Sequence, residues 1–191
     1  MSCLYLVLLT LSAIIFCETS PNRTITFEDW FNNLNEEEIP SLQLVHHGQK
    51  SYYFEIVLKA NYYQALQFCR YHGMQLLSIT SNEENEFLQS EIVKSGIVDP
   101  ALWTSGTKMP DGTQWIWMST GRPLIYTNWG IGEPNNAQNE QCISVRLTKQ
   151  FFTWNDLNCG SQSYFICENT WSKSCQDMLE DIKRTSIDQG D

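Results

Sequence analysis

Side chains that carry carboxylate or amide oxygens gather in two short stretches near the C-terminal end of this chain. One stretch lies just before Cys142 and the other just before Cys159. Calcium takes about six to eight oxygen ligands in proteins, and carboxylates and amides are among those it prefers. The two stretches therefore predict a calcium site beside cysteines that can clamp the segments together. The candidate ligands are Glu133, Asn135, Glu140, Asn155 and Asp156.

Two other interpretations of these side chains have to be weighed. They could belong to an ordinary polar loop. Paired carboxylates such as Glu133 and Asp156 could also suggest glycoside hydrolysis, which needs one protonated and one ionised carboxyl group. A bound calcium would keep both groups ionised, and the chain has no His-Glu-x-x-His, Gly-x-Ser-x-Gly or phosphate-loop motif. We therefore expect a binding protein and not an enzyme.

Length and charge limit the class of protein further. The chain has 191 residues and a formal net charge of −10 at pH 7. This length favours one domain with short extensions. The acidic balance argues against nucleic acid or an anionic membrane as a partner, because both attract clustered Lys and Arg.

The N-terminal segment is apolar from Leu4 to Cys17. It has the length of a signal-peptide core and is too short for a membrane span. We therefore expect residues 1–17 to be a signal peptide and the protein to be secreted and extracellular. The sequon Asn22-Arg23-Thr24 makes Asn22 a candidate glycosylation site.

The cysteine count suggests contact with another chain. There are seven cysteines, and Cys3 and Cys17 fall within the expected signal peptide, which leaves an odd number. An odd number in a secreted protein means that one thiol is free or pairs with a different chain. Cys175 is the candidate, because it shares an apolar stripe with Met178 in the tail and could join two copies in a homodimer.

The elements that position the ligands can be predicted from periodicity and caps. Thr26, Asn61 and Ser81 each precede a helical pattern, with Asp, Gln or Glu three residues later. Residues 120–141 show little periodicity and predict one long, functional loop. Trp129 indicates that this loop is ordered, and a bound calcium would add the energy that holds it. Helices are predicted at residues 26–38, 61–73 and 81–96, and strands at 50–58, 115–117, 143–147, 151–154 and 164–167.

Taken together, these features resemble the C-type lectin-like domain. The resemblance covers residues 46–169 and rests on Glu-Pro-Asn and Trp-Asn-Asp tripeptides that occur with Cys142, Cys159 and Cys167. It implies an α+β fold with two helices, antiparallel sheets and a long calcium-binding loop. The segment 18–45, with its short amphipathic helix, and the tail 170–191 lie outside it.

The resemblance also implies details of the site. The bridges are Cys69–Cys167 and Cys142–Cys159, the Glu133–Pro134 bond is cis, and the Asp156 carbonyl is a further calcium ligand. Members with a second calcium site carry acidic residues where this chain has Asn136 and Gln141, so we expect that second site to be absent or weak.

For function, the resemblance implies calcium-dependent sugar binding, as in the soluble single-domain lectins of invertebrates. The Glu133-then-Asn135 order resembles the mannose-type arrangement, whereas galactose-type members carry Gln-Pro-Asp. Two vicinal sugar hydroxyls complete the calcium shell, with Glu133 and Glu140 accepting their protons and Asn135 and Asn155 donating N–H. The expected ligands are mannose-type glycans on microbial or host glycoproteins. Fucose, N-acetylglucosamine and galactose remain open, as does a protein-binding module of the same fold that acts as a receptor ligand or as a defence or reproductive factor.

Overall fold

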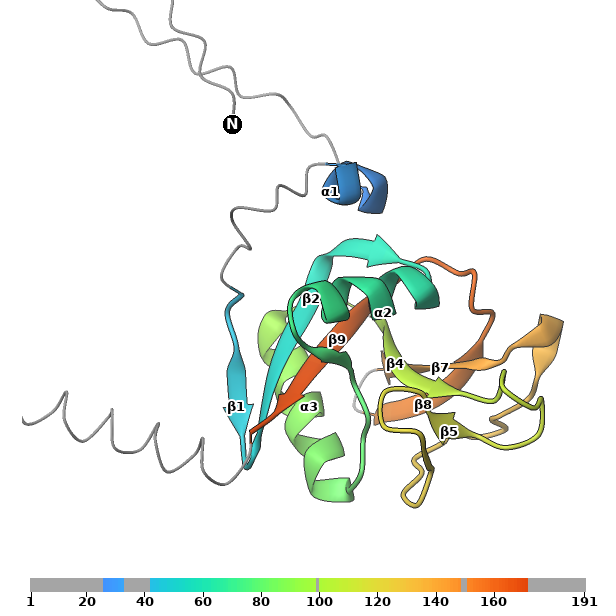
Figure 1. Cartoon of the computed structure of the whole chain (residues 1–191). Coiled ribbons are helices and arrows are strands. Elements are labelled where there is room, and N and C mark those ends of the chain that lie inside the picture. Colours follow the sequence, from blue (N-terminus) through green and yellow to red (C-terminus); the bar gives the residue numbers. More distant parts are fainter. Residues whose placement is uncertain (1–25, 33–41, 99, 149–150, 172–191) are drawn as a thin grey trace, which may run out of the picture.

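The computed structural model describes residues 26–32, 42–98, 100–148 and 151–171 (Figure 1). Within these residues, no helix combines the length and the apolar character needed to cross a membrane. The predicted signal peptide, the sequon at Asn22 and residues 172–191 of the tail, with Cys175, lie outside the described residues.

Three α-helices and nine strands make up the described part of the chain, with a short 3₁₀ turn at Ala137–Asn139. The helices are α1 (Phe27–Asn32), α2 (Tyr62–Tyr71) and α3 (Asn82–Ser95). The strands are β1 (Val45–His47), β2 (Lys50–Ala60), β3 (Gln75–Leu76), β4 (Ala101–Thr107), β5 (Ile116–Trp117), β6 (Arg122–Pro123), β7 (Cys142–Thr148), β8 (Phe151–Leu157) and β9 (Ser163–Thr170).

The strands form one hydrogen-bonded network in the order β1-β2-β9-β4-β5-β6. Strand β3 pairs with β9, β7 pairs with β4, and β8 adds to β7. All pairs are antiparallel except β4 with β9, which run parallel through Leu102 opposite Tyr164 and Trp103 opposite Phe165. The predicted α+β fold is confirmed, and the expectation of purely antiparallel sheets is corrected at this one pair.

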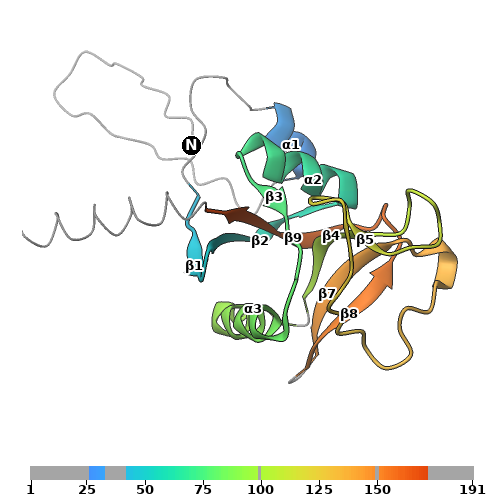
Figure 2. The same cartoon turned by 60° about the horizontal axis from the view of Figure 1, so that its bottom comes forward.

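Two hydrophobic cores lie on opposite faces of the central strands. Successive side chains of β9 point alternately into one core and the other. Phe165 packs in the core beneath α2, whereas Ile166 packs in the core that contains Leu88 and Ile92 of α3. Successive side chains of a strand point to opposite faces, so one strand can serve two cores. Figure 2 shows α2 and α3 on the two sides of the central strands.

The helix starts follow the predicted capping chemistry. Asn61 accepts a hydrogen bond from the Gln64 backbone N–H at 2.9 Å, and Gln64 Oε1 accepts one from the Asn61 backbone N–H at 2.9 Å. Thr26 and Asp29 form the same reciprocal pair at α1. The described part of α1 ends at Asn32, so residues 33–38 of the predicted helix lie outside the described residues.

Strand β4 was missed by the sequence interpretation, which predicted no strand at residues 101–107. From Leu102 to Thr107 every residue is buried. A strand covered on both faces shows no alternation of apolar and polar residues, which removes the period that identifies a strand.

Two disulfides tie the elements together, and both are those that the resemblance implied. Cys69 in α2 bonds Cys167 in β9, and Cys142 at the start of β7 bonds Cys159 after β8. The first joins residues 98 positions apart, and the second joins residues 17 apart. The shorter loop contains β7 and β8, so the second disulfide holds the base of the hairpin that carries Asn155 and Asp156.

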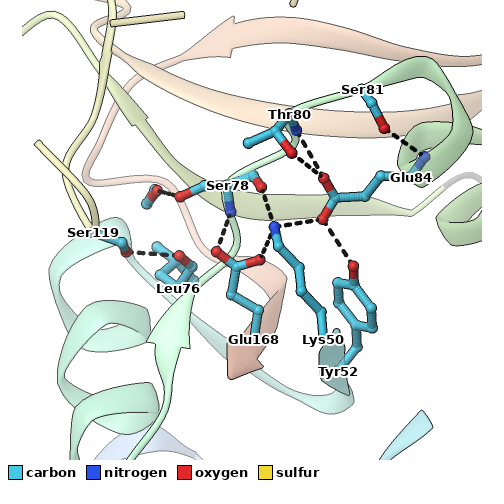
Figure 3. Close-up of polar contacts among 10 residues, drawn as sticks. Lys50, Tyr52, Leu76, Ser78, Thr80, Ser81, Glu84, Ser119 and Glu168 are labelled. Atoms are coloured by element: carbon cyan, nitrogen blue, oxygen red, sulfur yellow. Dashed lines mark hydrogen bonds and ion pairs between the residues drawn. The ribbon is translucent and has the colours of Figure 1, made fainter. Parts of the chain in front are cut away.

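A buried ionic cluster, formed by Lys50, Glu84 and Glu168, links β2, α3 and β9 (Figure 3). Lys50 Nζ lies 2.7 Å from Glu84 Oε1 and 2.8 Å from Glu168 Oε2, and it donates to the Ser78 carbonyl at 3.0 Å. Tyr52 donates its hydroxyl to Glu84 at 2.8 Å. Sequence reasoning assigned Glu84 to the helix start, where Ser81 does accept its backbone N–H. Its carboxylate has two roles, because Oε2 accepts the Thr80 backbone N–H whereas Oε1 binds this cluster.

One ammonium cannot neutralise two buried carboxylates. The pKa of Lys50 is raised, against the opposing effect of burial, by the charges of Glu168 and Glu84. The pKa of Glu168 is raised to about 7 by burial and by the like charge of Glu84, which outweigh the lowering effect of Lys50. Glu168 therefore changes its charge near neutral pH while Lys50 stays charged.

We expect the Glu168 contribution to stability to fall as pH rises. Its carboxyl binds a proton more tightly in the folded protein than in the unfolded chain, so its contribution is complete below its ordinary pKa of 4.5 and is lost by about pH 7. Each pKa unit corresponds to about 1.4 kcal/mol, which makes the total about 3 kcal/mol. Urea unfolding of the wild type and of Glu168→Gln between these pH values measures this contribution. The free energy of unfolding of the variant should lack the fall with pH that Glu168 causes in the wild type. If the free energy of unfolding changed with pH equally in the two proteins, the raised pKa would not belong to Glu168.

Candidate functional site

The paired strands β7 and β8 present the second ligand stretch. Asn155 lies opposite Ser144, and Asp156 lies opposite Ile143. Alternation along β8 buries Trp154 and Asp156, whereas Asn155 points to the other face and stays partly exposed. The two neighbouring candidate ligands therefore approach the site from different directions.

The Asp156 carboxylate joins β8 to the long loop. It is fully buried, at 0% exposure. Its Oδ1 accepts the Asn135 backbone N–H at 3.0 Å, and its Oδ2 accepts the Asn136 backbone N–H at 2.8 Å. Asp156 thus brings the Glu-Pro-Asn tripeptide onto the strand that carries the second stretch.

Protein contacts also order the long loop. The Gly130 N–H donates to the Trp154 carbonyl at 2.8 Å, and the Trp154 N–H donates to the Asn128 carbonyl at 2.8 Å. The Trp129 ring lies 5.2 Å from that of Trp115 and 5.8 Å from that of Trp154. The sequence interpretation assigned this role to bound calcium, but aromatic packing and the Asp156 carboxylate contribute part of it.

Within the tripeptide, an acceptor and a donor lie side by side. The Glu133–Pro134 peptide bond is cis, as the resemblance implied. Asn135 Nδ2 donates to Glu133 Oε1 at 2.9 Å, and the Asn135 backbone N–H donates to Glu133 Oε2 at 3.1 Å. The Asn135 side-chain carbonyl accepts the Ala137 N–H at 2.6 Å. The carboxylate and the amide are therefore held next to each other in a fixed order.

The carboxylates of the site repel one another. Burial raises the pKa of Glu133, and the negative charge of Asp156 raises it further. Burial also raises the pKa of Glu140, with added contributions from the charges of Asp156 and Glu133. Among the described residues, no Lys, Arg or His forms an ion pair with any of these three carboxylates.

Asn155 and Glu140 are less tightly connected to the other ligands. The Asn155 amide donates to the Asp156 backbone carbonyl, the oxygen proposed above as an extra calcium ligand. Glu140 follows the 3₁₀ turn and donates its backbone N–H to the Ala137 carbonyl at 3.1 Å. In the described part of the chain, no three His, Cys, Asp or Glu side chains gather closely enough to hold a metal by themselves. A calcium ion here would need the amide and carbonyl oxygens as well as the carboxylates.

A positive charge lies near Asn136, where a second calcium site was expected to be absent or weak. Lys108 Nζ donates to Asn136 Oδ1 at 2.7 Å. Asp111, the nearby acid, accepts the backbone N–H groups of Thr113 and Gln114, and these bonds lower its pKa. The absence of a second calcium site stays a prediction, which the Lys108 ammonium favours.

Comparison with known proteins places this fold in one class. The family model for the lectin C-type domain matches residues 58–169, so the chain belongs to the C-type lectin domain family. It is similar to perlucin of Haliotis laevigata, at 30% identity over 64% of this chain and 79% of that protein. Two solved structures, each with 25% identity or more, show how widely the fold is used.

The first is the cow C-type carbohydrate-recognition domain of CD23, solved in the presence of a GlcNAc2Man3 oligosaccharide. It is 30% identical, has a TM-score of 0.59, and is matched over 71% of this chain and 98% of its own. The second is a calcium-independent type II antifreeze protein, 25% identical with a TM-score of 0.57 over 69% of this chain and 95% of its own.

Proposed function

We propose that this chain is a secreted, calcium-dependent lectin that binds mannose-type sugars. The observation that carries the proposal is the arrangement around Asp156, where three carboxylates lie in mutual repulsion beside the amides of Asn135 and Asn155. A divalent cation would relieve that repulsion, and oxygen ligands of this kind suit calcium. The residues that would hold it are Glu133, Asn135, Glu140, Asn155 and Asp156.

Sugar recognition follows from the order of donors and acceptors. Bound calcium supplies open coordination positions for two neighbouring hydroxyls of a sugar. The Glu133 and Glu140 carboxylates accept the hydroxyl protons, and the Asn135 and Asn155 amides donate N–H to the hydroxyl oxygens. The Glu133 and Asn135 groups already lie 2.9 Å apart as an acceptor and donor pair. Both carboxylates remain ionised beside a cation, so we propose no catalytic role for them.

Affinity and location follow from the same chemistry. A single site of this size should bind a monosaccharide at about millimolar strength, so useful binding to glycans needs several sites per assembly. A homodimer linked through Cys175 would supply two sugar-binding sites. The disulfides Cys69–Cys167 and Cys142–Cys159 favour an oxidising compartment, which supports secretion.

A second candidate function is a protein-binding module that does not depend on sugar. Apolar side chains on the long loop favour it, because Ile125 is 91% exposed and Ile131 is 108% exposed. These exposed apolar side chains offer surface that a partner protein could bury. The calcium-independent antifreeze relative supports the view that the fold itself does not require the metal.

Affinity chromatography separates the two functions. We expect the purified chain to be retained on mannose-agarose in calcium and to be released by EDTA, because the sugar hydroxyls need the metal. If EDTA failed to release the protein from the column, or if the protein were not retained at all, the lectin proposal would be contradicted.

A paired substitution tests the hydroxyl scheme in the same assay. The double variant Glu133→Gln, Asn135→Asp exchanges the acceptor and the donor, and it should shift the preference from mannose towards galactose. Lys59→Met, on the exposed side of β2, is the control and should keep the wild-type preference. A double variant with unchanged selectivity would rule out the proposed order of donors and acceptors.

A further inference from the structure

One segment of the long loop, residues 136–141, has an unusual backbone. Asn136, Gln138 and Asn139 have positive φ values of 55°, 50° and 62°. This left-handed conformation costs every residue except glycine some free energy, asparagine least, so it persists where surrounding contacts hold it. Glu140, a proposed calcium and sugar ligand, lies inside the segment. The contacts that hold residues 136–141 therefore also position Glu140.

Lys108 directly follows β4 and contacts both ends of this segment, which runs beside the connection from β4 to β5 (Figures 1 and 2). Its Nζ donates to Asn136 Oδ1 at 2.7 Å, and its backbone N–H donates to the Gln141 carbonyl at 3.1 Å. Thr107 Oγ1 donates to the same carbonyl at 2.7 Å. Lys108 thus bridges the first and last residues of the segment that carries Glu140.

The two side chains of this contact are themselves held in place. The Lys108 ammonium lies 4.9 Å from the centre of the Trp115 ring, a cation–π contact, and Trp115 packs against Trp129 of the long loop at 5.2 Å. Asn136 has a second anchor, because its backbone N–H donates to Asp156 Oδ2 at 2.8 Å. Asn136 therefore joins the β4–β5 connection to strand β8.

The charge of Lys108 acts on a bound cation in the opposite direction. Burial and the charges of Asp156 and Glu133 raise the pKa of Glu140, and the Lys108 charge opposes them, so this charge reaches the site. A positive charge near a cation site weakens cation binding through Coulomb repulsion. If Lys108 contributed only its charge, its removal would strengthen calcium binding.

We propose that Lys108 is a positioning residue for the calcium and sugar ligands of the long loop, an inference that rests on the proposed lectin function. By joining Asn136 to Gln141, it holds the Glu140 carboxylate in place before metal or sugar binds. The ammonium touches neither ligand and acts through the segment that it holds. The benefit of a loop that is already ordered outweighs the repulsion between this ammonium and calcium.

Calorimetric titration of the full chain with calcium tests this proposal through Lys108→Met, which removes the ammonium but keeps the side-chain length and the backbone N–H. We expect the calcium affinity to fall about fivefold, which corresponds to the loss of one hydrogen bond. Lys108→Arg keeps a charged donor and should restore most of the affinity. Lys59→Met removes a comparable cation–π contact, 5.0 Å from the centre of the Tyr164 ring, and should leave the affinity unchanged. Calcium binding that is unchanged or tighter in Lys108→Met would overturn the proposal.

The acceptor of the hydrogen bond gives an independent test. Asn136→Gly removes the acceptor, leaves the Lys108 charge in place and suits the positive φ of this position. It should weaken calcium binding to a similar extent. The double variant Lys108→Met, Asn136→Gly should bind calcium no more weakly than Asn136→Gly alone, because both changes remove the same bond. Additive losses would mean that the two side chains act separately, which would also overturn the proposal.

Hydrogen exchange in EDTA separates this proposal from the lectin proposal. The Glu140 backbone N–H donates to the Ala137 carbonyl at 3.1 Å, and without metal it should exchange about fivefold faster in Lys108→Met than in the wild type. The urea midpoint should stay the same, because Lys108 belongs to neither hydrophobic core. Wild-type calcium binding with unchanged exchange in Lys108→Met would overturn only the role of Lys108. A wild type that binds no calcium would instead overturn the lectin proposal, and the exchange rates would still show whether Lys108 holds the segment.

Discussion

Replacing Asp156 by asparagine is expected to weaken calcium binding by about 100-fold or more and to abolish retention on mannose-agarose. The substitution removes one carboxylate from the proposed ligand set. It also replaces one of the two oxygens that accept the Asn135 and Asn136 N–H groups with an NH₂ donor. A buried donor left without an acceptor costs about 1–3 kcal/mol, and the lost negative charge adds to that cost.

Two measurements separate these effects. Calcium titration measures the loss of affinity directly. Hydrogen exchange in EDTA should show faster exchange at the Asn135 and Asn136 amides, because the loop then loses its anchor whether or not metal is bound. Asp111→Asn is the matched control, since Asp111 is exposed and bonds only the backbone of its own turn. Wild-type calcium affinity in Asp156→Asn would remove Asp156 from the proposed ligand set.

Lys50→Met is expected to destabilise the protein by about 3–5 kcal/mol at pH 8, the largest effect on folding that we predict. The change keeps the length of the side chain but leaves the carboxylates of Glu84 and Glu168 buried without their ammonium partner. The loss should be smaller at pH 5, because the two carboxylates can then take up protons. Urea unfolding at the two pH values measures both quantities.

Matched variants make this second result interpretable. Lys59→Met lies on the same strand but is exposed, with its ammonium 5.0 Å from the centre of the Tyr164 ring, and should cost less than about 1 kcal/mol. The double variant Lys50→Met, Glu168→Gln should recover part of the loss, since one buried carboxylate is then removed. A Lys50→Met protein as stable as Lys59→Met would show that the ionic cluster contributes little.

The two predictions concern different sets of contacts in the same molecule. The ionic cluster of Lys50 fixes β2, α3 and β9 to one another, and these elements carry the core. Asp156 fixes the long loop to β8, where the proposed calcium ligands lie. We therefore expect Lys50→Met to lower the free energy of unfolding and Asp156→Asn mainly to change ligand binding.

Much of the fold could be predicted from short-range features of the sequence. The reciprocal caps at Thr26 and Asn61 depend on residues three positions apart, so periodicity and residue type were enough to predict them. The candidate ligands could be named for a similar reason, because each tripeptide is a run of three consecutive residues. Their joint use in one calcium site remains a prediction.

Contacts between distant segments were decided only by the tertiary structure. Strand β4 is buried on both faces, so its sequence lacks the alternation that marks a strand. Glu84 has the type and spacing of a helix-capping residue, and Lys50, 34 positions away in the chain, gives its carboxylate a second role. The hydrogen bonds of Asp156 to a loop about 20 residues away were equally invisible. In each case the local pattern set which contacts the residue could make. The packing of remote elements brings charges and hydrogen-bond donors together out of water, and it decided which of those contacts form.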